Sequence, residues 1–246
     1  LIRPYINPYD LLKHVERFTD REGFAENRYS AECNARFITS KEDITFDEIY
    51  NFVSEKYRDL KEVELNFEYQ LLRPNNRVKA IYDLAKKLNK KIFIISDMYL
   101  PKSFLKKVLD KNGYTDYEEL YVSSENGIAK HTGNLFKEFL KEQNLHPSSV
   151  LHIGDSKHSD IKQPKKLGIH TFWVEKISDT FFKDKNNHRF FELYENNKNS
   201  LEISIILAEL AEKFVYDKTI FSSPTNYWKN FGYCIAGSIA YCYTRF

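Results

Sequence analysis

Two aspartates follow an apolar segment at a spacing that suits metal chemistry. Residues 149–153 have the character of a buried strand, Gly154 ends it, and Asp155 and Asp160 come next. A hard cation such as Mg²⁺ takes one or two protein carboxylates together with waters and substrate phosphate. The pattern predicts a site in which Asp155 is a metal ligand and Asp160 binds the ion or orients it through other groups. The alternative is that Asp155 only caps the following helix.

A hydroxyl, a carboxylate and a lysine follow two other strand-like segments upstream. Residues 91–95 form a short apolar run rich in β-branched side chains, typical of a strand buried on both faces, and Ser96 and Asp97 come directly after it. Residues 119–123 indicate another strand, and Lys130 lies in the loop after it. Ser96 and Asp97 could instead belong to an ordinary helix start, and Lys130 could be one more surface lysine.

An α/β fold would place these side chains close together. After residue 74, helical patterns alternate with strand patterns at residues 91–96, 119–123, 149–153 and 170–174. This alternation predicts a parallel sheet with right-handed crossovers, whose sites lie at the carboxyl ends of the strands. Ser96, Lys130 and Asp155 would therefore meet at one edge of the sheet.

The remainder of the chain is predicted to be helical. Residues 7–69 show helical spacing without a convincing strand, with helix starts at Asn7-Pro8 and at Thr45, where Glu48 completes a capping box. Arg3, Arg28 and Arg36 could meet an anionic substrate, or could simply be solvated or paired. Residues 201–215 and 227–243 predict two further helices, the second too short to span a membrane. We therefore divide the chain into residues 1–73, 74–180 and 181–246.

Composition excludes several classes of function. Lys and Arg total 37 against 35 Asp and Glu, a net charge of +2 without long runs of one sign, so nothing favours nucleic acid or an anionic membrane as a partner. Cys33, Cys234 and Cys242 show no Cys-x-x-Cys spacing, which fits a reducing cytoplasm and not zinc. Small phosphorylated molecules remain possible, because they need only local cations. The sequence says nothing about the oligomeric state.

The order of these motifs resembles that of a known family. A strand followed by serine, a loop lysine and a strand followed by Gly-Asp resemble the second, third and fourth motifs of the haloacid dehalogenase-like (HAD) phosphohydrolases. The runs Ser96-Asp97-Met98-Tyr99-Leu100-Pro101 and His152-Ile153-Gly154-Asp155 are most similar to HAD-type predicted hydrolases found with bacterial surface-polysaccharide biosynthesis genes. The resemblance covers residues 1–174 and implies a HAD-like Rossmannoid parallel sheet core with an N-terminal helical cap, followed here by C-terminal helices.

The resemblance also assigns roles to the candidate residues. Ser96 and Asp97 would bind the substrate, with Ser96 contacting a phosphate oxygen, and Lys130 would be a catalytic cation that offsets repulsion between nucleophile and phosphate. Asp155 and Asp160 would hold Mg²⁺. The implied activity is a Mg²⁺-dependent phosphohydrolase that acts on a small phosphorylated metabolite, for example a sugar phosphate of cell-surface glycan assembly.

One family motif is missing. The nucleophilic aspartate and the general acid/base belong to a strand that ends in Asp-x-x-Asp-Thr, which does not occur in residues 1–246. In similar proteins a segment like Leu1-Ile2-Arg3-Pro4 follows that motif directly, so we expect it just upstream of Leu1 and expect these residues alone to be an inactive fragment. The alternative is a non-catalytic HAD-like module of a larger glycan-building protein. A nucleotide-binding Rossmann domain is disfavoured, because no Gly-x-Gly-x-x-Gly follows a strand.

Overall fold

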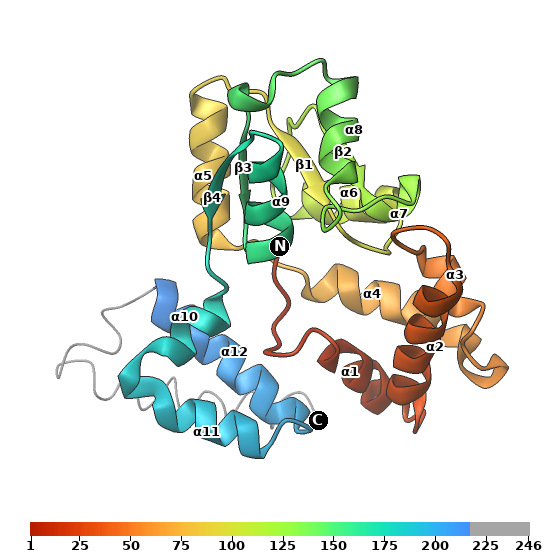
Figure 1. Ribbon diagram of the computed structural model, residues 1–246. Helices are drawn as coiled ribbons and strands as arrows, with labels where there is room; N and C mark the ends of the chain where they lie inside the picture. Colours follow the sequence, from red (N-terminus) through yellow and green to blue (C-terminus); the bar gives the residue numbers. More distant parts are fainter. Residues whose placement is uncertain (217–246) are drawn as a thin grey trace. The chain divides into compact units, whose positions relative to one another are not determined.

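The structure, a computed structural model, describes residues 1–216 (Figure 1). The chain forms two compact units, the first made of Leu1–Ile2 with Val15–Val174 and the second of Arg3–His14 with the chain from Glu175 onward. Among the described residues, no helix is both long and apolar enough to cross a membrane. The helix predicted at residues 227–243 lies outside the described part of the chain.

The N-terminal region is helical, as predicted. Its helices are α1 (Asp10–Thr19), α2 (Phe24–Ile38), α3 (Phe46–Tyr50), a 3-10 helix (Glu55–Leu60) and α4 (Lys61–Leu71). The capping box at α3 is confirmed, because Thr45 accepts the Glu48 N–H while Glu48 accepts the Thr45 N–H. The predicted helix start at Asn7-Pro8 lies in a turn that leads directly into α1. Asn7 Oδ1 accepts the Tyr9 N–H at 3.1 Å and the Asn7 carbonyl accepts the Asp10 N–H at 3.0 Å, and the regular helix begins at Asp10.

The predicted α/β alternation is confirmed after residue 74. All four predicted strands occur, each shorter than its sequence pattern: β1 (Phe93–Ser96), β2 (Glu119–Val122), β3 (Leu151–Gly154) and β4 (His170–Trp173). α5 (Asn76–Lys87) precedes β1. The helices between the strands are α6 (Lys102–Lys111), α7 (Ser123–Asn126), α8 (Asn134–Glu142), a 3-10 turn (Pro147–Ser149), a π-helical turn (Lys157–Lys162) and α9 (Gln163–Lys166). The fold is therefore α/β with parallel strands.

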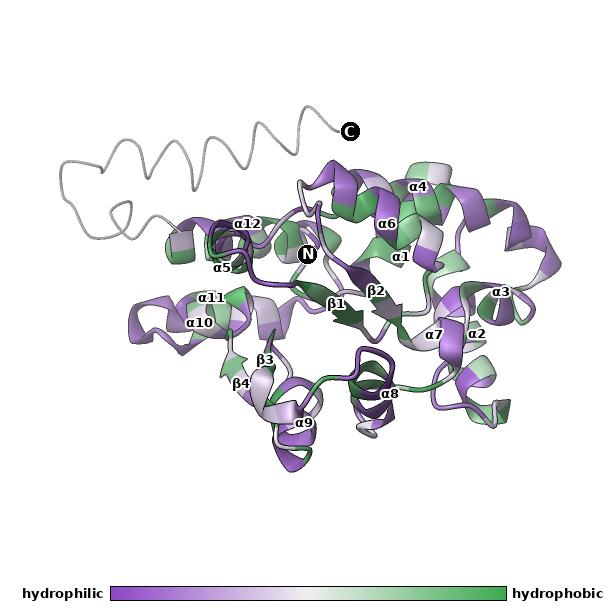
Figure 2. Ribbon diagram, turned by 90° about the horizontal axis from the view of Figure 1, so that it is seen from above, coloured by the Kyte–Doolittle hydropathy of each residue, from purple (hydrophilic) through white to green (hydrophobic). Residues whose placement is uncertain are grey.

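The strands form two pairs rather than one sheet. β1 pairs in parallel with β2 and β3 in parallel with β4, but the two pairs are not hydrogen-bonded to each other. Both ribbon views show the order β4, β3, β1, β2 across the core (Figures 1 and 2). Parallel strands are normally buried on both faces, yet Leu151 is 58% exposed and Phe172 is 52% exposed. Within residues 1–216, no strand pairs with the remaining edges of β1 and β3.

The β1–β2 pair is the better-packed half. Tyr121 on β2 packs against Leu135 and Phe139 of α8, and Phe93 of β1 joins this cluster. The Tyr121 and Phe139 rings meet edge to face with centroids 5.5 Å apart. This packing fixes the carboxyl ends of β1 and β2 relative to α8 and to the loop before it.

The second unit consists mainly of α10 (Ile177–Lys183), a 3-10 turn (Lys185–Asn187), α11 (His188–Asn196) and α12 (Leu201–Tyr216). Phe181 is fully buried and its ring contacts those of Phe190 and Phe214. The Ser204 hydroxyl on α12 accepts the Ile6 N–H at 3.0 Å, which connects the N-terminal residues to this unit. The helix predicted at residues 201–215 is confirmed by α12.

Candidate active site

The end of β1 carries the first two candidate residues. β1 ends at Ser96, whereas α6 begins at Lys102 with Pro101 as its N-cap. The Lys102 N–H is taken by Glu125 at 3.0 Å, so neither Ser96 nor Asp97 caps this helix. The alternative interpretation, in which Ser96 and Asp97 belong to an ordinary helix start, is therefore not supported. Within the described chain, the Ser96 hydroxyl makes no hydrogen bond to the protein.

Lys130 connects the loops that follow β1 and β3. Its backbone N–H donates to Asp97 Oδ1 at 2.7 Å, and its Nζ lies 2.6 Å from Asp160 Oδ1. Burial raises the pKa of the Asp97 carboxyl, although the Lys130 N–H and charge oppose that effect. The fold thus brings Asp97, Lys130 and Asp160 together from three separate segments, whereas the sheet argument named Ser96, Lys130 and Asp155 for this edge.

Asp160 is the most tightly held acid of the site. It is 3% exposed, and in addition to Lys130 it accepts the Ser156 N–H at 2.9 Å and lies 3.0 Å from His152 Nε2. Burial by itself would raise the pKa of this carboxyl, but the contacts with His152, Lys130 and Ser156 outweigh burial and hold the pKa well below its usual range. Asp160 is therefore a charged group at neutral pH.

Gly154 is needed to accommodate this acid. A Cβ atom at position 154 would lie 2.4 Å from Asp160 Cγ, a distance that real Cβ contacts do not reach. The Asp160 side chain thus packs directly over the last residue of β3. Glycine allows such a close approach because it has no side chain, and the group that approaches it is the Asp160 carboxylate.

Asp155 lies differently from Asp160. Its side chain is exposed at the end of β3, and its carbonyl accepts the Trp173 Nε1–H at 3.0 Å. The following helical turn is capped by Ser156, whose hydroxyl accepts the Ser159 N–H at 3.1 Å. Asp155 is therefore not the cap of this turn, and among residues 1–216 its carboxylate makes no hydrogen bond or ion pair.

The acids fit a magnesium site only in part. Among residues 1–216, no group of three or more His, Cys, Asp or Glu side chains is placed to hold a metal ion. Asp155 offers an exposed carboxylate of the type that Mg²⁺ prefers, and the ion needs only one or two of them. Asp160 already accepts a lysine and a backbone amide, so it fits an orienting role better than direct ligation.

Two of the arginines proposed for substrate binding have other partners. Arg28 is fully buried and binds Glu64 through Nε and Nη2, both at 3.0 Å, so the suggestion that it meets a substrate is wrong. Arg36 pairs with Glu32 at 3.1 Å and with Asp43 at 2.8 Å. Arg3 belongs to the second unit.

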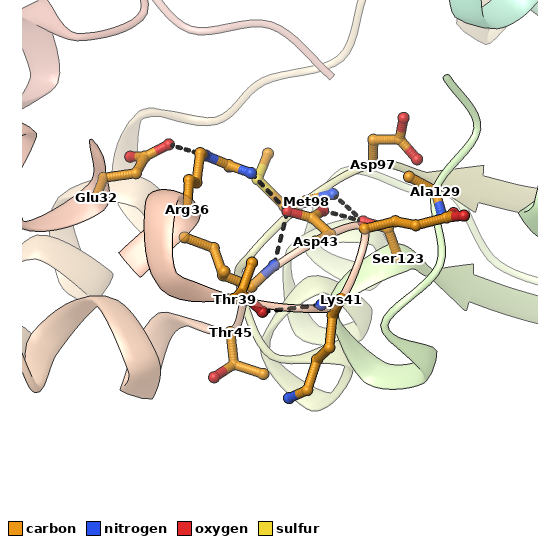
Figure 3. A network of polar contacts seen from close by, with 12 residues as sticks. Glu32, Arg36, Thr39, Lys41, Asp43, Thr45, Asp97, Met98, Ser123 and Ala129 are labelled. Atoms are coloured by element: carbon orange, nitrogen blue, oxygen red, sulfur yellow. Dashed lines mark hydrogen bonds and ion pairs between the residues drawn. The ribbon is translucent and has the colours of Figure 1, made fainter. Parts of the chain in front are cut away.

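A polar network that sequence reasoning missed joins α2 to the site (Figure 3). Asp43 Oδ1 accepts from Arg36, while Asp43 Oδ2 accepts the Ser123 hydroxyl. Ser123 Oγ in turn accepts the Met98 N–H at 2.8 Å, next to Asp97. No local pattern marks Asp43 and Ser123 for the contact between them, because they lie 80 residues apart in the sequence.

The low pKa of Asp160 makes a prediction about acid stability. A carboxyl whose pKa is lowered by folding contributes its full stabilisation above its unfolded pKa of about 4, and loses it as the pH falls through the folded value. We expect Asp160→Asn to lower the unfolding free energy by about 1–3 kcal/mol at neutral pH, and to flatten its decline in acid. Urea unfolding across this pH range measures both effects. Asp47→Asn, at an exposed carboxyl on α3, is the control, and equal behaviour of the two variants would contradict the prediction.

Comparison with known proteins agrees with this geometry. Residues 12–174 match the family model described as haloacid dehalogenase-like hydrolase. The chain belongs to the haloacid dehalogenase-like hydrolase family. The HAD assignment made from Ser96, Lys130 and Asp155 is therefore confirmed at the level of the family and the fold.

Individual HAD relatives are distant. A glyceraldehyde 3-phosphate phosphatase from Methanocaldococcus jannaschii is 27% identical over 140 residues, which cover 54% of this chain and 60% of that protein. The enzyme of the same name from Pyrococcus abyssi is 26% identical over 110 residues, or 45% of this chain and 46% of the relative. The chain thus matches about half the length of these curated relatives.

A solved HAD structure supports the fold alone. L-2-haloacid dehalogenase from Xanthobacter autotrophicus, with chloropropionic acid covalently bound, gives a TM-score of 0.51 at 10% sequence identity. The alignment covers 87% of this chain and 95% of the dehalogenase.

Proposed function

We propose that the protein is a phosphohydrolase that acts on a small phosphorylated metabolite. The observation that carries the proposal is the position of Lys130 at the carboxyl ends of the strands, where Asp97 accepts its backbone N–H and Asp160 contacts its charged Nζ. A fixed cation at this edge suits a transferring phosphoryl group, because catalysis of phosphoryl transfer is mainly positioning and charge stabilisation. The phosphatases among the curated relatives support the same reaction.

In this reaction each candidate residue would have its own role. Ser96, whose hydroxyl has no partner in the described chain, would donate to a phosphate oxygen, with Asp97 beside it at the substrate. Lys130 would offset the repulsion between an incoming phosphate and an acidic nucleophile. Asp155 would hold Mg²⁺ and Asp160 would keep Lys130 and the Asp155 loop in place. The ion, when bound, would neutralise charge on the phosphate oxygens.

The nucleophile would come from a segment outside residues 1–246. We propose that an additional parallel strand, ending in Asp-x-x-Asp-Thr, lies between β1 and β3. Two features support this position: among residues 1–216 no strand pairs with the remaining edges of β1 and β3, and the Leu151 side chain on β3 is exposed. The carboxyl end of such a strand would lie beside Ser96 and Asp155, since parallel strands share one carboxyl edge.

The substrate class follows by analogy. Relatives named for glyceraldehyde 3-phosphate favour a small sugar or triose phosphate. A role in cell-surface glycan assembly rests on the motif resemblance alone. The cysteine content fits a cytoplasmic location, and the near-neutral charge gives no support for a nucleic-acid partner.

Two versions of the protein test the proposal. Residues 1–246 and a protein extended upstream through the expected motif are incubated with Mg²⁺ and a panel of triose and sugar phosphates, and released phosphate is measured. We expect release only by the extended protein, and loss of that release in its Asp155→Asn variant. Appreciable release by residues 1–246 alone would contradict the external nucleophile. An upstream sequence without Asp-x-x-Asp-Thr would favour the non-catalytic binding module instead.

A further inference from the structure

We infer that Glu42 is a positioning residue that holds the loop of Lys130 in its working geometry. The inference rests on the proposed function for the role of Lys130. Glu42 lies between α2 and α3, in the helical region, and its partners lie 87 to 92 residues further along the chain. Nothing in the local sequence relates it to the sheet edge.

The carboxylate of Glu42 accepts three hydrogen bonds from one short loop. Oε2 accepts the Ala129 N–H at 2.8 Å and the Thr132 hydroxyl at 2.6 Å, and Oε1 accepts the side-chain amide of Asn134. The Glu42 N–H also donates to the Gly127 carbonyl at 3.0 Å. One residue therefore contacts the loop on both sides of Lys130.

These contacts fix the backbone that leads into Lys130. Glu42 holds the amide of Ala129, and Asp97 holds the next amide, that of Lys130 itself. With two successive amides fixed by carboxylates, the direction of the Lys130 side chain toward Asp160 is determined.

Residues next to Glu42 make similar contacts with the loop after β1. Asp43 reaches the Met98 N–H through the Ser123 hydroxyl, and the Phe46 N–H donates to the Tyr99 carbonyl at 2.8 Å. The segment at residues 42–46 thus contacts both loops that carry proposed phosphate ligands. Within this segment, Glu42 is the residue whose side chain contacts the loop of Lys130.

Glu42→Ala and Glu42→Gln together separate positioning from mere stability. Alanine removes all three acceptor contacts. Glutamine keeps one oxygen for Ala129 and Thr132, and the Asn134 amide can rotate to accept from the new NH₂ group, so the loop should be largely restored. Glu62→Ala, at an exposed glutamate on α4, is the matched control.

The first measurement uses residues 1–246 and needs no activity. We expect hydrogen exchange of the amides in residues 127–134 to become about tenfold or more faster in Glu42→Ala, to stay near the parent rate in Glu42→Gln, and to be unchanged in Glu62→Ala. Unchanged exchange in Glu42→Ala would overturn the inference, whatever the activity of the protein.

The second measurement uses the extended protein with its phosphorylated substrate. We expect Glu42→Ala to lower kcat about tenfold or more with little change in KM, because Lys130 acts on the transferring group, and Glu42→Gln to restore most of kcat. Faster loop exchange with unchanged kcat would overturn the positioning role. If the extended protein released no phosphate at all, the proposed function would fail, while the exchange result would still decide whether Glu42 holds the loop.

Discussion

Arg28→Ala is expected to lower the free energy of unfolding by about 3–5 kcal/mol. The Arg28 guanidinium is fully buried, with Glu64 at 3.0 Å and Glu32 at 3.3 Å. Tyr50 also donates to Glu64 at 2.7 Å. Removing the arginine would leave a buried carboxylate without its cation, and burial already raises the pKa of Glu64. Urea unfolding followed by circular dichroism measures the loss.

Two comparisons show whether burial is the cause. Lys86→Ala removes one member of an exposed pair with Asp116, and we expect no measurable change from it. Arg28→Met combined with Glu64→Leu removes both charges of the Arg28–Glu64 pair, while Glu32 keeps Arg36 as its partner, and should recover part of the stability lost in Arg28→Ala. A loss in Arg28→Ala as small as that in Lys86→Ala would show that the buried pair does not support the helical region.

Lys130→Ala is expected to reduce kcat of the extended protein by about a hundred- to a thousandfold. The lysine is held at the carboxyl edge of the strands by Asp97 and Asp160, so alanine removes a cation that solvent cannot replace in the same position. Steady-state hydrolysis of the preferred phosphorylated substrate measures the effect. Circular dichroism of the same variant shows that the fold persists.

Lys141→Ala is the matched control for this change. Lys141 is exposed in the last turn of α8, at the opposite end of the helix from the Lys130 loop, and has the same charge. We expect its kcat to equal that of the parent protein. A similar kcat in Lys130→Ala and the parent would remove Lys130 from the reaction and leave it a structural partner of Asp160.

The elements of the fold could largely be predicted from the sequence. Short strand-like segments, of which residues 91–95 are rich in β-branched side chains, predicted the four strands, and helical spacing predicted the segments between them, because both patterns depend on near neighbours. The capping box at Thr45 was predicted for the same reason. The ends of the strands then indicated that Ser96, Lys130 and Asp155 belong to one edge, since a parallel alternation has a fixed direction.

Pairing across long separations was decided by the tertiary structure alone. The sequence determined the order of the strands along the chain, the acids and lysine after them, and the absence of Asp-x-x-Asp-Thr from residues 1–246. Only the folded chain buried Arg28 against Glu64, directed Asp160 to Lys130, and brought Glu42 to Ala129. It also left the two strand pairs separate. Local periodicity specifies which face of an element is apolar, whereas the partner of a charged side chain depends on which distant elements pack together.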